Sequence, residues 1–243
     1  ENPLRFPGWT LPGVMGAGAA QTMANVQRVL PGKRILMDRI WKCRRDCCVP
    51  ASQAGADVVG IVEGMPKIGA YGVHAAKIRR AGIPFYLGST IAEAKGTDHV
   101  EKAVIAKFEN GQIVKGTEME TDVDVICVAV GLRPLSELAQ MAGVQHDFIP
   151  EMGGWMPLHN MDMETSVPGI YVAGDTAGVE EASTAMDEGR LAAAAAAEAL
   201  GYLSKEEAEK IKTGIRERLD SLRQGPFGDR RMAAKERIIE KGV

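Results

Sequence analysis

A carboxylate in the last third of the chain stands in a context suited to binding a hydroxylated organic molecule. The apolar segment GIYVA leads directly into Gly174 and Asp175, and an alanine-rich helix is predicted soon after. A carboxylate at the end of a buried strand can accept hydrogen bonds from the polyol chain of a flavin. The first turn of the helix can direct backbone N–H groups at the pyrimidine edge of the flavin ring, and this turn contains Glu181, Ala182 and Ser183. The sequence therefore predicts part of a flavin-binding site.

A second carboxylate, Glu63, ends the apolar run ADVVGIVE. An acid at the end of the second strand of a dinucleotide-binding unit accepts hydrogen bonds from ribose hydroxyls and disfavours a 2′-phosphate, which predicts NAD(H) as the ligand. The alternative is an ordinary charged residue at a strand end. Gly131 follows another buried run, VDVICVAV, and allows the chain to turn sharply at the carboxyl end of that strand, where open α/β sheets bind ligands.

The segment 38–52 reads DRIWKCRRDCCVPAS and stands where a dinucleotide-binding unit has its G-x-G-x-x-G turn and first helix. It shows no amphipathic period. When each codon is read from its second base, the segment is compatible with glycines at positions 39, 41 and 44, which is the spacing of that fingerprint. The sequence favours a reading-frame slip over the alternative, a genuine and irregular basic loop.

Two other features carry weaker patterns. Cys43, Cys47 and Cys48 form a C-x3-C-C cluster that matches no standard zinc pattern, so no metal site is expected. Cys127 lies within an apolar run and is predicted to be a small buried side chain. The tripeptide at 16–18, Gly-Ala-Gly, opens a predicted helix, but no apolar strand precedes it, so a close packing turn is favoured over a phosphate site.

The apolar runs alternate with helical segments, which predicts an α/β fold with a mostly parallel sheet. Strands are predicted at 33–37, 56–63, 83–87, 123–130 and 169–173, a hairpin with a tight turn at Asn110-Gly111, and helices at 19–30, 72–81 and 182–200. Ser204 is predicted to cap a last helix with an apolar stripe of Ile211, Ile215, Leu219 and Leu222.

The composition excludes several classes of protein. The 243 residues carry a net charge of −3, which implies no attraction to nucleic acid, and no apolar run approaches the ~20 residues that span a bilayer. No signal peptide is visible, so a cytoplasmic location is expected. The chain begins at Glu1, without Met, in loop-forming sequence, and this start suggests a fragment.

The segment TSVPGIYVAGDTAG, together with DEGRLAA, resembles the second flavin motif of the pyridine nucleotide–disulfide oxidoreductase superfamily. ENPLRFPGWTLPGVMGAGAAQ resembles the segment that links the flavin and NAD domains of these proteins, most closely in the sarcosine oxidase alpha, opine, proline and cyanide-forming dehydrogenase subunits. The resemblance implies a Rossmann-like NAD-binding domain inserted in an incomplete Rossmann-like FAD-binding domain, whose first flavin motif would precede Glu1. The implied parts are a linker and part of the FAD domain at 1–32, an NAD(H) domain at 33–115, the end of the FAD domain at 116–203 and a helical extension at 204–243.

The resemblance further implies a FAD-dependent enzyme that exchanges hydride between NAD(H) and the flavin, with an unknown small-molecule substrate. No side chain is nominated as a catalytic acid or base. One rival is a nucleotide-binding, electron-transfer subunit of a heteromeric amine or opine dehydrogenase, which requires a second dehydrogenase subunit. The other rival is an inactive fragment. A homo-oligomer is also compatible with the sequence.

Overall fold

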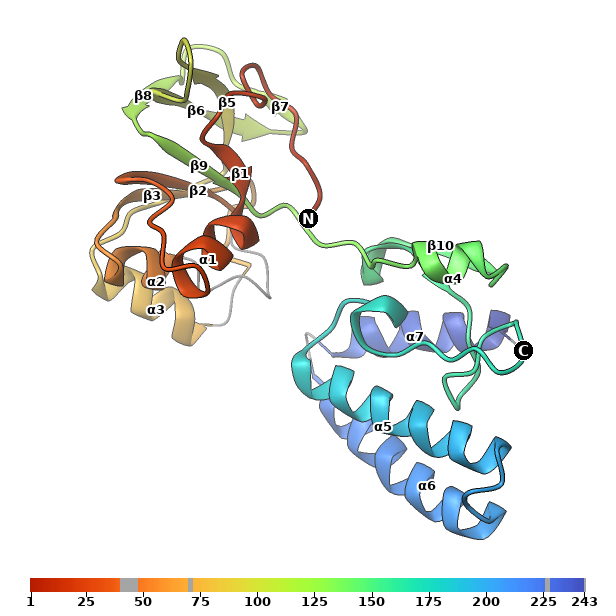
Figure 1. The fold of residues 1–243 in the computed structure, drawn as a ribbon. Coiled ribbons are helices and arrows are strands. Elements are labelled where there is room, and N and C mark those ends of the chain that lie inside the picture. Colours follow the sequence, from red (N-terminus) through yellow and green to blue (C-terminus); the bar gives the residue numbers. More distant parts are fainter. Residues whose placement is uncertain (40–47, 70–71, 226–227, 243) are drawn as a thin grey trace. The chain divides into compact units, whose positions relative to one another are not determined.

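The chain forms two compact units, Glu1–Gly131 and Leu132–Val243, in a computed structural model (Figure 1). The structure describes residues 1–39, 48–69, 72–225 and 228–242. The segments assigned from the sequence to NAD and FAD domains stay predictions. Among the described residues, none of the helices is both long enough and apolar enough to cross a bilayer.

The first unit is built on a five-stranded sheet in which all neighbouring strands are parallel. The strand order is β1 (Val14–Gly16), β9 (Val125–Val128), β2 (Arg34–Asp38), β3 (Asp57–Glu63) and β4 (Phe85–Leu87). Four of these strands contain the predicted apolar runs, because a parallel strand is covered on both faces and needs apolar side chains throughout. The α/β class and the parallel sheet are therefore confirmed.

The two faces of this sheet are covered by different layers. Helices α1 (Ala17–Asn25), α2 (Cys48–Gln53) and α3 (Gly72–Arg80) gather on one face (Figure 1). Strands β5 (Ser89–Lys95), β6 (Lys102–Glu109), β7 (Gln112–Ile113) and β8 (Met119–Asp122) form an antiparallel sheet on the other. The side chains of β2 alternate accordingly: Ile35 and Met37 pack into the helical core, and Leu36 packs with the antiparallel strands.

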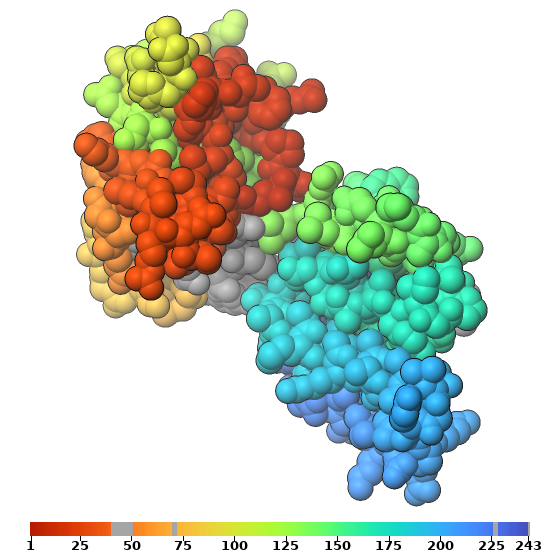
Figure 2. Space-filling model, viewed as in Figure 1, coloured from red at the N-terminus to blue at the C-terminus, as the bar shows by residue number. Residues whose placement is uncertain are grey.

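The predicted hairpin at Asn110-Gly111 joins β6 to β7. Both turn residues have positive φ, 50° at Asn110 and 80° at Gly111, as a primed two-residue turn requires. The N-terminal segment packs beside these antiparallel strands, where Ala94 N–H donates to Pro7 O at 2.8 Å. In the space-filling view, its red atoms lie against the yellow atoms of this sheet (Figure 2).

The second unit contains mainly helices and turns. In chain order it comprises α4 (Glu137–Met141), the hairpin β10 (His146–Ile149) and β11 (Gly154–Pro157) with the short helix η1 (Pro150–Met152) between its strands, η2 (Gly174–Ala177), α5 (Ala182–Ala199), α6 (Lys205–Leu222) and α7 (Asp229–Gly242). The predicted helix at 182–200 is confirmed, and Gly201 follows it with a φ of 77°. Ser204 caps α6, accepting a hydrogen bond from Glu207 N–H, as predicted.

The predicted apolar stripe of α6 is only half right. Ile215 and Leu219 are buried, but Ile211 and Leu222 are exposed. Lys212 lies on the buried side instead, because its ammonium group pairs with Asp162 at 2.8 Å and with Glu198 at 2.7 Å. A charged side chain can be buried when carboxylates compensate it, and a pattern of apolar residues does not reveal such a partner.

Two further expectations for this unit are corrected. The segment 169–173 does not form a strand, because its pairing is limited to an isolated bridge between Tyr171 and Glu164, and a strand requires a continuous ladder with a neighbour. The helix capped by Ser204 is not the last, since α7 follows it. α7 lies within the helical extension implied at 204–243, but it was not predicted as a separate helix because its buried face consists of Ala234, Lys235 and Ile238, which is not an apolar stripe.

Candidate functional site

The predicted flavin motif folds into one compact turn. Gly174 opens η2 with a φ of 65°, and a Cβ added there would lie 3.3 Å from Ala185 Cβ in α5. Gly174 N–H donates to Glu188 Oε2 at 2.9 Å. The neighbouring Asp175 is exposed. The turn therefore needs glycine at its first position and presents the Asp175 carboxylate to solvent, where it can accept hydrogen bonds from hydroxyl groups.

The N-terminus of α5 lies next to this turn. Glu181 is the N-cap residue, and Thr184 Oγ1 accepts a hydrogen bond from Glu181 N–H at 3.2 Å. Ala182 is exposed, and Ser183 is half-buried. The structure thus brings the five predicted flavin-binding residues together at one helix end, where the helix dipole favours electron-rich groups of a ligand. Their binding roles stay predictions.

Glu63 and Gly131, the two predicted nucleotide-binding residues, both lie in the first unit. Glu63 ends β3, is buried, and accepts a hydrogen bond from Met65 N–H at 3.1 Å. Gly131 follows β9 and has a φ of 131°, with its carbonyl oxygen accepting from Asn2 N–H at 2.9 Å. Because both residues follow parallel strands of one sheet, they lie at the carboxyl edge of that sheet, where α/β proteins bind ligands.

Asp38 is a residue at this edge that the sequence did not single out for chemistry. It ends β2, is 1% exposed, and neither carboxyl oxygen has a hydrogen-bond partner in the described structure. Burial raises the pKa of Asp38 to about 7; the Arg39 guanidinium opposes this rise, and Glu63 adds to it. An ionised carboxylate here would repel the pyrophosphate of a dinucleotide, so Asp38 does not fit that group.

Arg39 adopts a backbone conformation that suits glycine. Its φ is 66°, and its N–H donates to Val62 O at 2.6 Å, which ties it to the neighbouring strand. The left-handed region costs a residue with a Cβ about 1 kcal/mol. The conformation agrees with the glycine that the shifted reading frame places at position 39. Positions 41 and 44 lie outside the described residues.

We expect Arg39→Gly to raise the free energy of unfolding by about 1 kcal/mol, because glycine adopts this φ without strain. Urea unfolding of the 243-residue chain measures the change. Arg39→Ala is the matched control, since it removes the same charge and keeps the Cβ, and it should not stabilise the chain. Equal stabilisation by both substitutions would assign the effect to charge and contradict the backbone explanation.

No apolar strand was expected before the tripeptide at 16–18, and the structure has a short, half-buried one there. The three-residue strand β1 pairs in parallel with β9 and leads directly into α1, but it is too short for a recognisable apolar run. Gly18 N–H is hydrogen-bonded to the Glu1 carboxylate, at 3.0 Å from Oε1 and 3.1 Å from Oε2. A Cβ on Gly16 would collide with this carboxylate. The N-terminus of α1 therefore does hold an anionic group, supplied by the chain itself.

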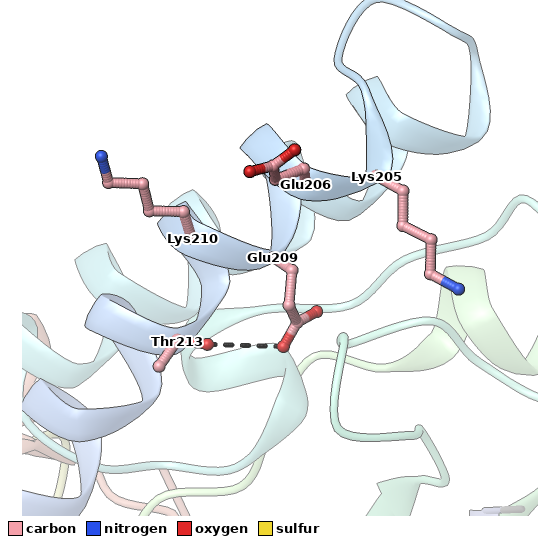
Figure 3. Close-up of a pocket in the computed structure, with 5 residues that line it drawn as sticks. All are labelled: Lys205, Glu206, Glu209, Lys210 and Thr213. Atoms are coloured by element: carbon pink, nitrogen blue, oxygen red, sulfur yellow. Dashed lines mark hydrogen bonds between the residues drawn. The ribbon is translucent and has the colours of Figure 1, made fainter.

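The remaining candidates do not form a site in the part of the chain that the structure covers. Cys43 and Cys47 lie outside the described residues, whereas Cys127 is buried in β9, as predicted. No three described His, Cys, Asp or Glu side chains gather as metal ligands. A shallow hollow on α6 is lined by side chains of a single helix, with Thr213 donating to Glu209 (Figure 3). None of the residues that line this hollow belongs to the predicted flavin motif.

A family model and several curated proteins match the sequence of this chain. The family model described as pyridine nucleotide-disulphide oxidoreductase matches residues 45–189. The HcnB component of hydrogen cyanide synthase from Pseudomonas protegens is 25% identical over 91% of the chain and 51% of its own length. A subunit of opine oxidase from Agrobacterium tumefaciens is 30% identical over 81% of the chain and 41% of its own length. The chain thus spans about half the length of the curated relatives it matches.

Solved structures share the fold at low sequence identity. Thioredoxin reductase of T. acidophilum has a TM-score of 0.64 at 20% identity, covering 80% of this chain and 61% of the other. L-proline dehydrogenase from P. horikoshii has a TM-score of 0.59 at 20% identity, covering 88% and 35%. These likenesses establish a Rossmann-like fold. Because the family model covers more than half of the 243 residues, the chain belongs to the pyridine nucleotide–disulfide oxidoreductase family, whose members are oxidoreductases that use FAD and NAD(P)H.

Proposed function

We propose that this chain is the NAD(H)-binding part, and one half of the flavin-binding part, of an oxidoreductase that exchanges hydride between NAD(H) and FAD. The observation that carries the proposal is the turn at Gly174 and Asp175, which lies against the N-terminus of α5. FAD, when bound, would supply the two-electron chemistry. The contribution of the chain is to bind and orient the cofactor.

In this proposal each residue of the motif has a defined role. Gly174 allows the backbone to turn closely past the cofactor because it has no Cβ. Asp175 accepts hydrogen bonds from the polyol hydroxyls. The first turn of α5, at Glu181, Ala182 and Ser183, directs N–H groups and the positive end of the helix dipole at the flavin ring.

The nucleotide half of the proposal rests on Glu63 and Gly131. Glu63 accepts from the ribose hydroxyls, and its charge favours NAD(H) over NADP(H). Gly131 allows the chain to turn sharply after β9, which lies beside β2, and so leaves room for a ligand at this edge of the sheet. In this sequence Asp38 and Arg39 oppose the binding of NADH. The reason is that a buried carboxyl group and a bulky side chain stand where a dinucleotide-binding unit has its glycine turn. Weak NADH binding by this chain is therefore expected.

We also propose that the protein works with a second dehydrogenase subunit, on a small-molecule amine or opine-like substrate. The support is that the relatives are named as subunits: of hydrogen cyanide synthase, of opine oxidase and of sarcosine oxidase. A nucleotide-binding subunit that only transfers electrons is the alternative within this proposal. An inactive fragment is the alternative outside it, and the cytoplasmic location expected from the sequence stays a prediction.

We expect the 243-residue chain to bind FAD weakly, and Gly174→Ala to weaken binding by about tenfold, since a Cβ strains the turn and crowds Ala185. Quenching of FAD fluorescence on titration with protein measures the dissociation constant. Gly189→Ala, in α5, is the matched control, because a Cβ there meets open space and should leave binding unchanged.

Two results would count against this proposal. If the folded wild-type chain shows no quenching of FAD fluorescence at millimolar protein concentration, the inactive fragment is favoured. If Gly174→Ala and Gly189→Ala bind FAD as tightly as each other, the flavin does not contact this turn. Copurification with a second flavoprotein chain would instead favour the heteromeric enzyme.

A further inference from the structure

Four buried charged side chains gather beside the flavin-motif turn. Their side chains are between 2% and 9% exposed, and they comprise Glu180, Glu188, Arg223 and Lys235. We refer to these four as the buried quartet. Glu180 precedes α5 and Glu188 lies within it, whereas Arg223 caps the C-terminus of α6 and Lys235 lies in α7. The quartet therefore joins both C-terminal helices to the segment that follows Asp175.

The quartet is internally paired. Arg223 Nη2 donates to Glu188 Oε1 at 2.5 Å and to Glu180 Oε1 at 2.8 Å, and its Nε lies 3.1 Å from Glu180 Oε2. Lys235 Nζ lies 2.7 Å from Glu188 Oε1. Two cations thus compensate two carboxylates, which is the condition under which charges remain ionised inside a protein.

The quartet is also hydrogen-bonded directly to the backbone of the turn. Glu188 Oε2 accepts from Gly174 N–H at 2.9 Å, while Lys235 Nζ donates to Ala177 O at 2.8 Å. These two contacts hold the first and the last residue of η2. The conformation of the turn is therefore fixed by side chains from α5 and α7 as well as by its own hydrogen bonds.

A third contact reaches the other half of the motif. Arg231, at the start of α7, lies with Nη1 3.5 Å from Glu181 Oε1. Glu181 is the N-cap residue of α5. α7 thus contacts both parts of the motif, the η2 turn through Lys235 and the N-terminus of α5 through Arg231. In Figure 1 the two helices begin on the same side of the second unit.

Such an arrangement is stable only when all its members are present. Removing one partner leaves an uncompensated charge in a site from which water is excluded, so the remaining side chains must rearrange. Binding sites whose supporting residues are loose lose affinity even when every contacting residue is intact. The geometry of the turn therefore depends on the docking of α7.

We propose that α6 and α7 hold the flavin-motif turn in its binding geometry, and that Arg223 and Lys235 are positioning residues acting through Glu188 and Ala177. The flavin part of this inference rests on the proposed function above, whereas the effect on the turn itself does not. None of the positioning side chains needs to touch the cofactor.

The test combines amide hydrogen exchange, resolved by NMR, with FAD titration of the 243-residue chain. Lys235→Met keeps the aliphatic stem and removes the charge, and it should speed exchange of the Gly174 amide by at least about tenfold and weaken FAD binding by a similar factor. Exchange within 191–195 of α5 should remain slow, because a local effect spares the middle of that helix. Lys235→Arg should restore part of both properties.

Lys241→Met is the matched control, since it removes the same charge from an exposed position on the same helix. It should change neither exchange nor binding. If Lys235→Met does not fold, Arg231→Met tests the inference in its place. Arg231 is 13% exposed and contacts the motif from outside the quartet. It should weaken FAD binding more than Lys241→Met does.

Unchanged exchange at Gly174 in folded Lys235→Met would overturn the inference, as would equally fast exchange throughout α5. So would equal FAD binding by Arg231→Met and Lys241→Met. A wild-type chain that binds no FAD, yet shows the local exchange effect, would refute the proposed function and leave the positioning role intact.

Discussion

Asp38→Asn is expected to remove a pH-dependent loss of about 4 kcal/mol in the stability of the first unit. The Asp38 carboxyl has a pKa of about 7 in the folded chain, against an ordinary value of 3.8. Between these two values the unfolded chain releases the proton and the folded chain retains it. The stability of the wild-type unit therefore falls as the pH rises from about 4 to about 7, and is level above that range. An amide does not titrate, so this slope should vanish in the variant.

Urea unfolding at about pH 5 and about pH 8, on either side of the folded-state pKa, measures the effect. Amide exchange in β2 and β9 at the same two pH values shows that the effect lies in the first unit. At the higher pH Asp38→Asn should be clearly more stable than the wild type, and the difference should shrink at the lower pH. Arg39 and Glu63 are the charged neighbours that act on this carboxyl, with opposite signs. Asp57→Asn, at the exposed start of β3, serves as the control and should leave the slope in place. Parallel pH profiles for wild type and Asp38→Asn would disprove the explanation.

His159→Gln is expected to remove a pH-dependent loss of stability in the second unit, and this loss occurs as the pH falls rather than as it rises. His159 is 1% exposed, its Nδ1 lies 2.8 Å from Asn160 O, and its Nε2 has no hydrogen-bond partner in the described structure. Burial, helped by the nearby charges of Lys235 and Arg223 and opposed by the Asn160 contact, lowers the pKa of His159 to about 3. Because Asn160 O can only accept, the neutral ring carries its proton on Nδ1.

The direction of this pH dependence follows from the difference between the pKa of His159 in the folded chain and in the unfolded chain. The unfolded chain takes up a proton near pH 6.5 and the folded chain does so only near pH 3, so stability is lost as the pH falls between these values, by up to about 5 kcal/mol. Glutamine does not titrate, and His159→Gln should therefore show a shallower acid limb. With Trp9→Phe and Trp41→Phe in the background, Trp155 is the remaining tryptophan, and its fluorescence during urea unfolding at about pH 4 and about pH 7 reports on this unit.

His99→Gln provides the control, because His99 is exposed and lies in the other unit. It should leave the acid limb of the second unit unchanged. An acid limb for His159→Gln as steep as that of the wild type would show that carboxylates with a lowered pKa, such as that of Asp162, dominate the acid sensitivity instead.

The parallel sheet of the first unit was predictable because its strands are buried on both faces. The runs that form β2, β3 and β9 are largely apolar along their length, which distinguishes them from neighbouring loops. β1 has only three residues and escaped notice for that reason. The segment 169–173 has the composition of a strand, but composition does not show whether a neighbouring strand is available to pair with it.

The turn at Gly174 and Asp175 and the helix start that follows it could be located from the sequence because glycine, aspartate and the helix start stand in fixed order there, whereas the flavin-binding role of the turn stays a prediction. The side chains that support it could not. Glu188 lies 14 residues beyond Gly174 and Lys235 lies 58 residues beyond Ala177, and local patterns contain no information about such pairs. Asp38 was likewise invisible, because an orphaned carboxyl is recognised only once its surroundings are known.

The contact between Lys235 and Ala177 also sets an order of events during synthesis. A ribosome releases the chain from its N-terminus, so η2 and α5 emerge long before α7. Until 58 more residues have been added, Ala177 O lacks its ammonium donor and Glu188 lacks one of its two cations. The turn at Gly174–Ala177 is therefore completed only after α7 has been made, and a nascent chain cannot reach the finished geometry of that turn before that helix has folded.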